Sequence, residues 1–196
     1  KEKFNYELVC GYFGHLYKGR GIELILEISK ILPNILFLIY GGNQNEIDNF
    51  RNLNKNKNVI FKGYCSHMEV NKNSRLVDIL LMPYQEKVSL GLEGTDTSRW
   101  MSPMKMFEYM STGVPIISSD IPVLREVLKD SFNCLFSIPN DPTSWVENIL
   151  KIRDNKELAK TISRNAFNEY KYKYTWKIRA KKIIEIHESP SEIKNF

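Results

Sequence analysis

Residues 6–40 read YELVCGYFGHLYKGRGIELILEISKILPNILFLIY and contain the pattern that decides the fold. An apolar run at Tyr6–Tyr12 leads through a glycine-rich turn into residues with helical spacing, and a second apolar run follows at Ile35–Tyr40. The helical stripe ends at Pro33 and comprises Ile22, Ile25, Leu26, Ile28, Ser29 and Leu32. Short apolar strands on either side of an amphipathic helix are typical of parallel strands joined by a right-handed crossover.

The alternation of strand-like and helix-like segments continues along the chain. Four more apolar runs predict strands at Asn58–Lys62, Val77–Met82, Pro115–Ser118 and Cys134–Phe136. Apolar stripes predict helices around Ile47, Phe50 and Leu53, around Met104, Phe107 and Met110, at Thr143–Arg153, at Lys156–Lys171 and from about Thr175. We therefore predict an α/β domain over residues 1–188: a Rossmann-like parallel sheet with helices on both faces, plus C-terminal helices and a tail at 189–196.

Length and composition exclude several other classes of protein. The chain has 196 residues, of which 42% are hydrophobic and 26% charged, so it is neither disordered, collagen-like nor disulfide-dense. No run approaches the roughly 20 apolar residues that cross a bilayer, and no apolar signal core follows the first residues, so we expect a cytoplasmic protein. The sequence begins without Met and almost directly with a strand, from which we expect that an upstream domain is absent.

The cysteines and histidines give no metal or disulfide pattern. Cys10, Cys65 and Cys134 are odd in number and far apart, and the three histidines cluster neither with them nor with one another. We expect reduced thiols and no protein-built metal site.

The excess positive charge lies in the last quarter of the chain. Residues 1–150 contain 16 Lys and Arg against 17 Asp and Glu, whereas residues 151–196 contain 12 against 6. The basic side chains follow a helical pattern and are Lys171, Lys173, Lys177, Arg179, Lys181 and Lys182. This segment could be a solvated helix face or could attract an anionic membrane surface. It lacks the aromatic and basic pattern of a nucleic-acid platform, so we expect no nucleic-acid partner.

Two segments could bind an anion. The first is the turn Gly11–Gly21, whose glycines would let the backbone approach a phosphate at the start of a helix, close to Lys18 and Arg20. Its spacing differs from the Walker and dinucleotide patterns, so a plain tight turn is an equal alternative.

The second segment is Ser102–Pro115. Ser102 suits an N-cap and Pro103 the first turn, so the helix should direct free amides toward the edge of the sheet. Glu108 lies in an apolar stripe, where a buried carboxylate needs a partner: either ligand hydroxyls or an ion pair with Lys105. The long irregular stretch Tyr84–Met101 precedes this helix and leaves the predicted ligand-binding edge of the sheet.

The ordered set of these pieces resembles the C-terminal, nucleotide-sugar-binding domain of the retaining glycosyltransferases of group 1, also called family 4, which have the GT-B fold. The resemblance covers about residues 6–187 and includes the turn Gly14–Gly21, Tyr40-Gly41-Gly42, Val59–Gly63, Val77–Pro83, Ser102–Met110, Gly113–Asp120 and Glu126. It implies donor binding by this chain and acceptor binding by an N-terminal domain that the given sequence lacks. The acceptor would be a glycan or a lipid-linked glycan.

The resemblance also implies roles for single residues. His15 and Arg20, with Lys105 as a third cation, would stabilise the diphosphate leaving group, and no cofactor or metal would be needed. Glu108 would bind the ribose hydroxyls. The remaining donor-binding positions would be Gly14, Gly41, Gly42, Gly63, Tyr64, Ser102, Pro103 and Met104.

Two positions depart from the family pattern. Trp100 stands where the first glutamate of the Glu-seven-residues-Glu motif is expected, so that carboxylate is missing or is supplied by Asp96 or Glu93. His15 replaces the usual arginine, and imidazole is only partly protonated near neutral pH.

Taken as a whole, the resemblance predicts a hexosyltransferase-like, metal-independent enzyme whose isolated donor half is inactive. The alternative is a non-catalytic nucleotide-sugar-binding module.

Overall fold

The computed structural model describes residues 6–89, 96 and 100–188. The strands are β1 (Leu8–Phe13), β2 (Ile35–Tyr40), β3 (Val59–Gly63), β4 (Ile79–Met82), β5 (Ile116–Ser119) and β6 (Leu135–Ser137). The α-helices are α1 (Ile22–Ile31), α2 (Gln44–Leu53), α3 (His67–Asn73), α4 (Met104–Met110), α5 (Pro122–Arg125), α6 (Pro142–Asp154), α7 (Lys156–Glu169) and α8 (Trp176–Glu188). All six predicted strands are present, with ends shifted by at most two residues.

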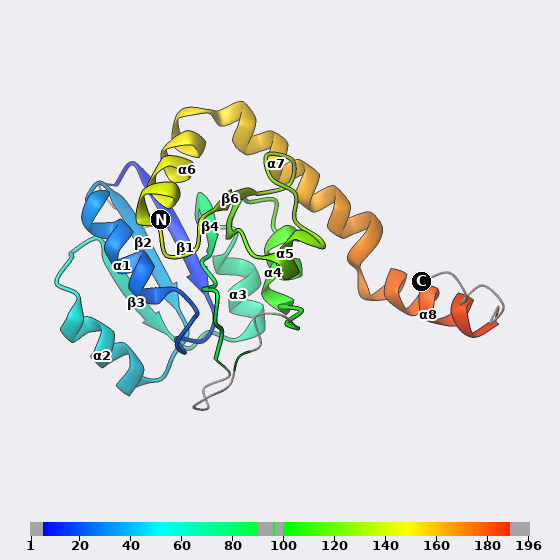
Figure 1. Ribbon diagram of the computed structural model, residues 1–196, viewed down its shortest axis with the longest axis horizontal. Coiled ribbons are helices and arrows are strands. Elements are labelled where there is room, and N and C mark those ends of the chain that lie inside the picture. The colour runs from blue at the N-terminus through cyan, green and yellow to red at the C-terminus, as the bar shows by residue number, and fades with distance from the viewer. Residues whose placement is uncertain (1–5, 90–95, 97–99, 189–196) are drawn as a thin grey trace.

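The strands form one parallel sheet in the order β3-β2-β1-β4-β5-β6 (Figure 1). The chain builds one half of the sheet outward from β1 to β3 and the other half from β4 to β6. The connections therefore run in opposite directions from the β1–β4 pair, and a crevice opens beyond the carboxyl ends of these two strands. The predicted Rossmann-like α/β fold is confirmed, and its topology places a ligand site at this edge.

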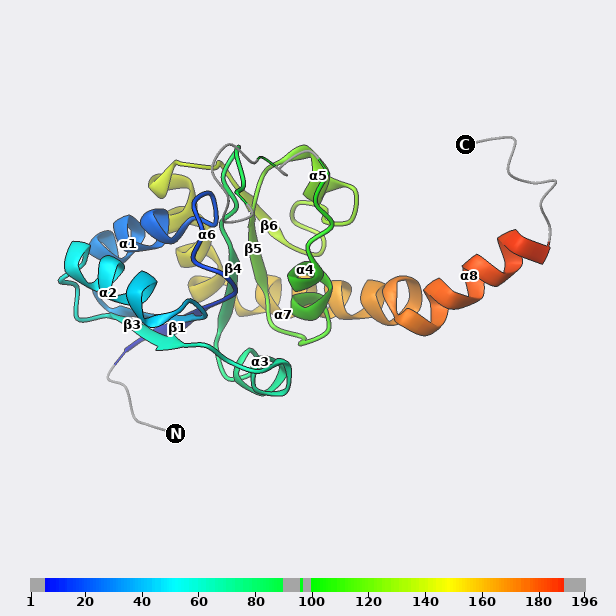
Figure 2. The same ribbon diagram turned by 90° about the horizontal axis from the view of Figure 1, so that it is seen from below.

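Helices cover both faces of the sheet, which explains why its strands are apolar throughout. In β2, Ile35, Phe37 and Ile39 belong to the core beneath α1 and α6, while Leu36 and Leu38 belong to the core beneath α4. Figure 2 shows α6 and α4 on opposite sides of β4 and β5. Because successive side chains of a strand point to opposite faces, a strand covered on both faces has no polar alternation.

The helical stripes were predicted with different success. The six residues of the first stripe, five in α1 and Leu32 at its C-cap, are all buried, as predicted. In α2, Ile47 is buried and Phe50 is partly buried, but Leu53 is 73% exposed, so its assignment to the stripe was wrong. Leu53 is the last residue of α2, and the backbone is already extended at the C-cap Asn54.

Two short helices, α3 and α5, were not predicted. None of the side chains of α3 is buried, so the helix has no apolar periodicity to detect. Its start is marked by a capping box, in which the side chains of Ser66 and Glu69 bond each other's backbone amides. That Ser-x-x-Glu spacing was the available signal.

The C-terminal helices leave the body of the domain. After α7, a π-helical turn at Tyr170–Tyr174 leads to α8, which extends away from the sheet (Figures 1 and 2). Glu169 stabilises the junction, because its buried carboxylate accepts hydrogen bonds from Asn133 and Lys173.

Among the described residues, no helix has the length and apolarity needed to cross a bilayer. The three cysteines are free.

Candidate functional site

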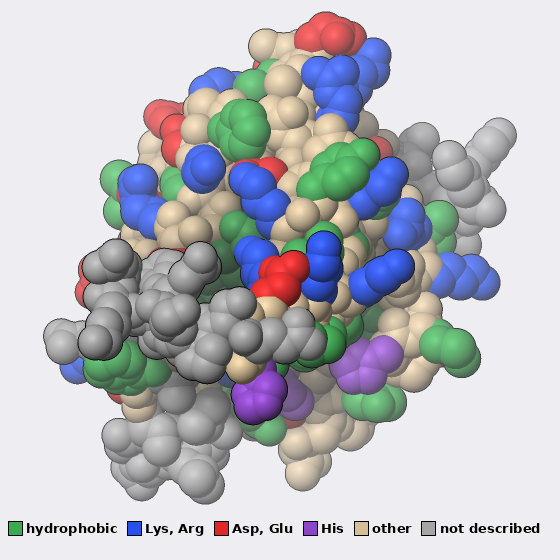
Figure 3. Space-filling view, turned by 90° about the vertical axis from the view of Figure 1, so that its right-hand side faces the viewer, with side chains coloured by type: hydrophobic (Ala, Val, Ile, Leu, Met, Phe, Trp, Pro, Cys, Tyr) green, Lys and Arg blue, Asp and Glu red, His purple; other side chains and the backbone are tan. Residues whose placement is uncertain are grey.

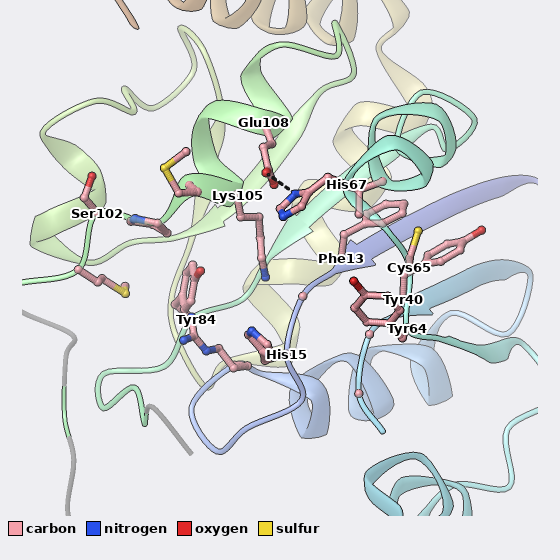
Figure 4. A pocket seen from close by; sticks show the side chains of 18 of the residues that line it. Phe13, His15, Tyr40, Tyr64, Cys65, His67, Tyr84, Ser102, Lys105 and Glu108 are labelled. Atoms are coloured by element: carbon pink, nitrogen blue, oxygen red, sulfur yellow. Dashed lines mark ion pairs between the residues drawn. The ribbon is translucent and has the colours of Figure 1, made fainter. Parts of the chain in front are cut away.

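A cavity of about 600 Å³ opens at the carboxyl ends of β1, β2 and β4, where the topology reverses. It brings together segments from the four loops that follow β1, β2, β3 and β4 with residues of α3 and α4 (Figure 4). Eleven of the twelve predicted site residues line it: Gly14, His15, Arg20, Gly41, Gly42, Tyr64, Ser102, Pro103, Met104, Lys105 and Glu108. Sequence positions up to 94 residues apart thus meet in one place.

Gly63 is the predicted residue that does not line the cavity. Its carbonyl oxygen accepts a hydrogen bond of 2.6 Å from the amide of Gly41. Gly63 therefore supports the loop that follows β2 from behind. Its direct contact with the donor stays a prediction.

Two cations lie close together on one wall of the cavity. The guanidinium carbon of Arg20 is 5.1 Å from the ring centre of Tyr84, and the Nζ of Lys105 is 5.2 Å from the same centre. No carboxylate of a described residue forms an ion pair with either side chain. The Nε of Arg20 is buried without a hydrogen-bond partner. A buried donor without a partner is costly, so this wall is built for an anion.

Lys105 is held among aromatic rings. Its Nζ lies 3.9 Å from the ring centre of Tyr12, and Figure 4 shows the side chain directed between Tyr84 and His15. Burial and the charge of Arg20 lower the pKa of Lys105 well below its ordinary value, although the carboxylate of Glu108 opposes the shift. Because the protonated form of this amine is destabilised, a negatively charged ligand beside it would stabilise that form strongly.

Glu108 faces the cavity from α4. Of the two alternatives for Glu108, the ion pair with Lys105 does not form. Instead the Oε1 of Glu108 lies 3.6 Å from the Nδ1 of His67 on α3, as the dashed line in Figure 4 marks. The side chain of Glu108 is 38% exposed, so the expected burial was also wrong. The spacing of Lys105 and Glu108 allows a pair within one helix, but Lys105 turns toward the loop after β1.

The glycine-rich turn after β1 contributes only its first part to the cavity. Gly41 approaches Gly14 so closely that a Cβ on Gly41 would collide with the carbonyl oxygen of Gly14. Gly21, with φ of 78°, packs in the same way against the carbonyl oxygen of Pro83. The second half of the turn therefore lets the loop after β4 approach. Lys18, which was expected to add charge beside Arg20, lines a separate cavity.

The segment before α4 lines the cavity without a side-chain cap. The helix begins at Met104, its N-cap is Pro103, and no side chain caps it. The predicted capping role of Ser102 is thus wrong, because the helix starts one residue too late for the hydroxyl to reach its amides. Ser102 is exposed at the mouth of the cavity.

Several aromatic lining residues were not predicted. The rings of Phe13 and Tyr40 stack with centres 4.5 Å apart, and the amide of Phe13 donates to the hydroxyl of Tyr109 over 2.9 Å. Tyr84 and His67 also line the cavity. The available signal was position, because Phe13 and Tyr40 end β1 and β2, and Tyr84 follows β4 by two residues.

Trp100 lies at the mouth of the same cavity and is 86% exposed. Asp96, one of the two carboxylates considered as substitutes at this position, accepts a hydrogen bond from the amide of Val88 and does not line the cavity. Glu93, the other, lies outside the described residues. Within the described part of the chain, no three His, Cys, Asp or Glu side chains are grouped to hold a metal ion.

The chain is similar in sequence to curated glycosyltransferases. The uncharacterised glycosyltransferase MJ1178 of Methanocaldococcus jannaschii is 25% identical over 96% of this chain and 49% of its own length. The alpha-galactosylglucosyldiacylglycerol synthase of Streptococcus pneumoniae is 25% identical over 80% of this chain and 41% of its own length. The chain thus spans about half the length of the curated relatives it matches.

Solved structures show the same fold. Alr3699/HepE of Anabaena, solved in complex with UDP, superposes with a TM-score of 0.78 at 15% identity over 94% of this chain and 49% of its own. The same protein has been solved with UDP-glucose. A family model described as "Glycosyl transferases group 1" matches residues 1–169. This chain belongs to the group 1 glycosyl transferases.

Proposed function

We propose that this chain is the donor-binding half of a glycosyltransferase that moves a sugar from a nucleoside-diphosphate sugar to an acceptor with retention of configuration. The observation that supports this most strongly is the pair of cations, Arg20 and Lys105, without an acidic partner among the described residues. A cavity of about 600 Å³ lies in the range of small-molecule sites. A bound diphosphate supplies the charge that the wall lacks.

The proposed catalytic device is fixed positive charge at the leaving group. As the bond between the anomeric carbon and the diphosphate breaks, negative charge grows on the phosphate oxygens. Arg20 and Lys105, with the exposed His15 at the rim, stabilise that charge without reorganising. These cations do the work that a divalent ion does in other enzymes, so we expect transfer to persist in EDTA.

The backbone supplies the remaining proposed donor contacts. Gly14, Gly41 and Gly42 border the cavity without side chains, and residues 102–104 form the wall on the side of α4. We place the phosphates and sugar hydroxyls along these segments. Tyr64, 84% exposed at the end of β3, would lie against the base, with Gly63 behind it.

The acceptor side is assigned to the rest of the protein. We infer that residues 1–188 form the donor domain and that an N-terminal acceptor domain completes a cytoplasmic enzyme. A labelled donor and membrane extract should therefore yield a glycan or lipid-linked product with the full-length protein, and none with this chain alone. If the full-length protein bound the donor but neither transferred its sugar nor hydrolysed it, a non-catalytic nucleotide-sugar-binding module would be favoured instead.

Glu108→Ala is expected to weaken UDP binding by about 1 to 3 kcal/mol, because ribose hydroxyls would lose a charged acceptor. The measurement is a calorimetric titration of wild type, Glu108→Ala and Glu147→Ala, the last being an exposed carboxylate of α6 outside the cavity.

The ribose assignment has its own control, 2′-deoxy-UDP. Wild type should bind it more weakly than UDP, whereas Glu108→Ala should bind both alike. An equal preference for UDP in wild type and variant would remove Glu108 from the ribose site.

We also propose that α8 attracts the enzyme to an anionic membrane surface. Trp176, Ile183 and Ile184 recur on one side of α8 and are 65%, 60% and 55% exposed. Lys177, Arg179, Lys181 and Lys182 are all exposed as well. Figure 3 shows basic side chains outnumbering acidic ones on the described part of this end of the molecule. An apolar stripe flanked by cations suits the interface of an anionic bilayer.

Neutralising these four cations to Gln should reduce binding to phosphatidylglycerol vesicles strongly, since each basic residue near the surface contributes about 1 kcal/mol. Co-sedimentation at low and high salt measures the effect, with zwitterionic vesicles as the control. Binding that is insensitive to salt and to the substitutions would contradict this proposal and favour packing of α8 on the proposed N-terminal domain.

A further inference from the structure

The cavity has two differently built ends on either side of its cations. One end is lined by the stacked rings of Phe13 and Tyr40, which end β1 and β2, and by Tyr64, which follows β3. The other end is formed by the segment that leads into α4, including Trp100. Figure 4 shows Tyr40 and Tyr64 on one side of Lys105 and Ser102 on the other.

The chemistry of a nucleoside-diphosphate sugar assigns its parts to these ends; this step rests on the proposed function. Its diphosphate joins the nucleoside to the sugar, so a diphosphate at Arg20 and Lys105 places one part at each end. The carboxylate of Glu108 lies beside His67, on the helix that follows Tyr64. A ribose that bonds Glu108 therefore directs its base toward Tyr64, and the sugar must lie toward Trp100.

Trp100 has the properties of a stacking surface. It is 86% exposed, and it forms no hydrogen bond or ring contact with any described residue. A large aromatic side chain left open at the mouth of a charged cavity favours a ligand with an apolar surface. A pyranose ring offers one, because the C–H bonds on one of its faces are not covered by hydroxyls.

We propose that Trp100 is the platform on which the transferred sugar of the donor lies, and thus a specificity-determining residue. A carboxylate at this position would select hydroxyls by hydrogen bonding. An indole ring selects instead for a pyranose with an accessible C–H face. Differences between sugars that leave this face intact should then affect binding little.

The test compares UDP with UDP-glucose in calorimetric titrations of this chain. Trp100→Ala should leave the affinity for UDP within about twofold of wild type and weaken UDP-glucose binding by about tenfold, since only the sugar loses its apolar contact. Trp100→Phe should retain most of the affinity. Trp176→Ala, an exposed tryptophan outside the cavity, should change neither affinity.

Each other outcome would overturn the assignment. Equal losses for UDP and UDP-glucose would place Trp100 at the nucleoside, and no loss for either would remove it from the site. If wild type bound neither UDP nor UDP-glucose, nor the GDP and ADP pairs, the proposed function itself would fail.

Fluorescence gives an independent readout. Trp145 is fully buried, so in a Trp176→Phe background the quenching by iodide reports mainly on Trp100. UDP-glucose should protect this fluorescence, and UDP should protect it much less. Equal protection by the two ligands would contradict stacking of the sugar.

Discussion

Arg20→Ala is expected to weaken UDP binding by about 100-fold, close to 3 kcal/mol, because charge-assisted hydrogen bonds to the phosphates are lost. The guanidinium lies beside Tyr84 with a buried Nε that has no partner in the structure. Its contact with the ring of Tyr84 reduces the conformational entropy that is lost when a phosphate binds. The measurement is calorimetry at constant ionic strength.

Two companion variants make the result specific. Arg20→Lys keeps the charge but loses the planar fork, so an intermediate affinity is expected. Arg164→Ala removes an exposed cation of α7 that does not line the cavity and should leave the affinity unchanged. If Arg20→Ala and Arg164→Ala behaved alike, Arg20 would not contact the diphosphate.

Lys105→Met is expected to change affinity and stability in opposite directions. UDP binding should weaken by about 30-fold, or 2 kcal/mol, because a charged donor at the diphosphate is lost. The free energy of unfolding near pH 7 should rise by about 1 kcal/mol, because an amine without an acidic partner is replaced by an apolar chain among Tyr12 and Tyr84.

The gain in stability should depend on pH with a definite sign. Burial lowers the pKa of Lys105 in the folded state, so the unfolded state binds more protons. The contribution of this group to the free energy of unfolding therefore rises with pH, from the lowered pKa up to its unfolded value of about 10.4. The advantage of Lys105→Met should consequently be largest at low pH within that window and shrink toward pH 10.

Urea unfolding at several pH values measures this difference. Lys30→Met, at an exposed position of α1, serves as the matched control and should have a small effect that does not vary with pH. A destabilised Lys105→Met protein, or an advantage that grew with pH, would contradict the account of a strained amine.

The fold could be predicted because its determinants are local. Continuous apolar strands such as Ile35–Tyr40 require helices on both faces of the sheet. The apolar spacing in α1 predicts an amphipathic helix. The helix α3, which buries no side chain and contributes His67 to the cavity, was not predicted. A helix without an apolar face leaves only its cap to be detected.

The residues of the candidate site could be predicted more readily than their partners. The segments that line the cavity follow from the positions of the strand ends. The partners depend on rotamers and on loops that meet only in the folded chain: Lys105 turns to Tyr12 rather than Glu108, and Gly21 packs on Pro83 rather than facing the cavity. Spacing along one helix or turn cannot reveal such contacts.

We propose above all that this chain binds a nucleoside diphosphate through Arg20 and Lys105. The most direct test is a calorimetric titration of this chain with UDP, GDP and ADP in EDTA, for wild type and Arg20→Ala. Saturable binding of one diphosphate by wild type, lost in the variant, is the predicted result. Binding that required a divalent metal, or that survived the substitution unchanged, would contradict it.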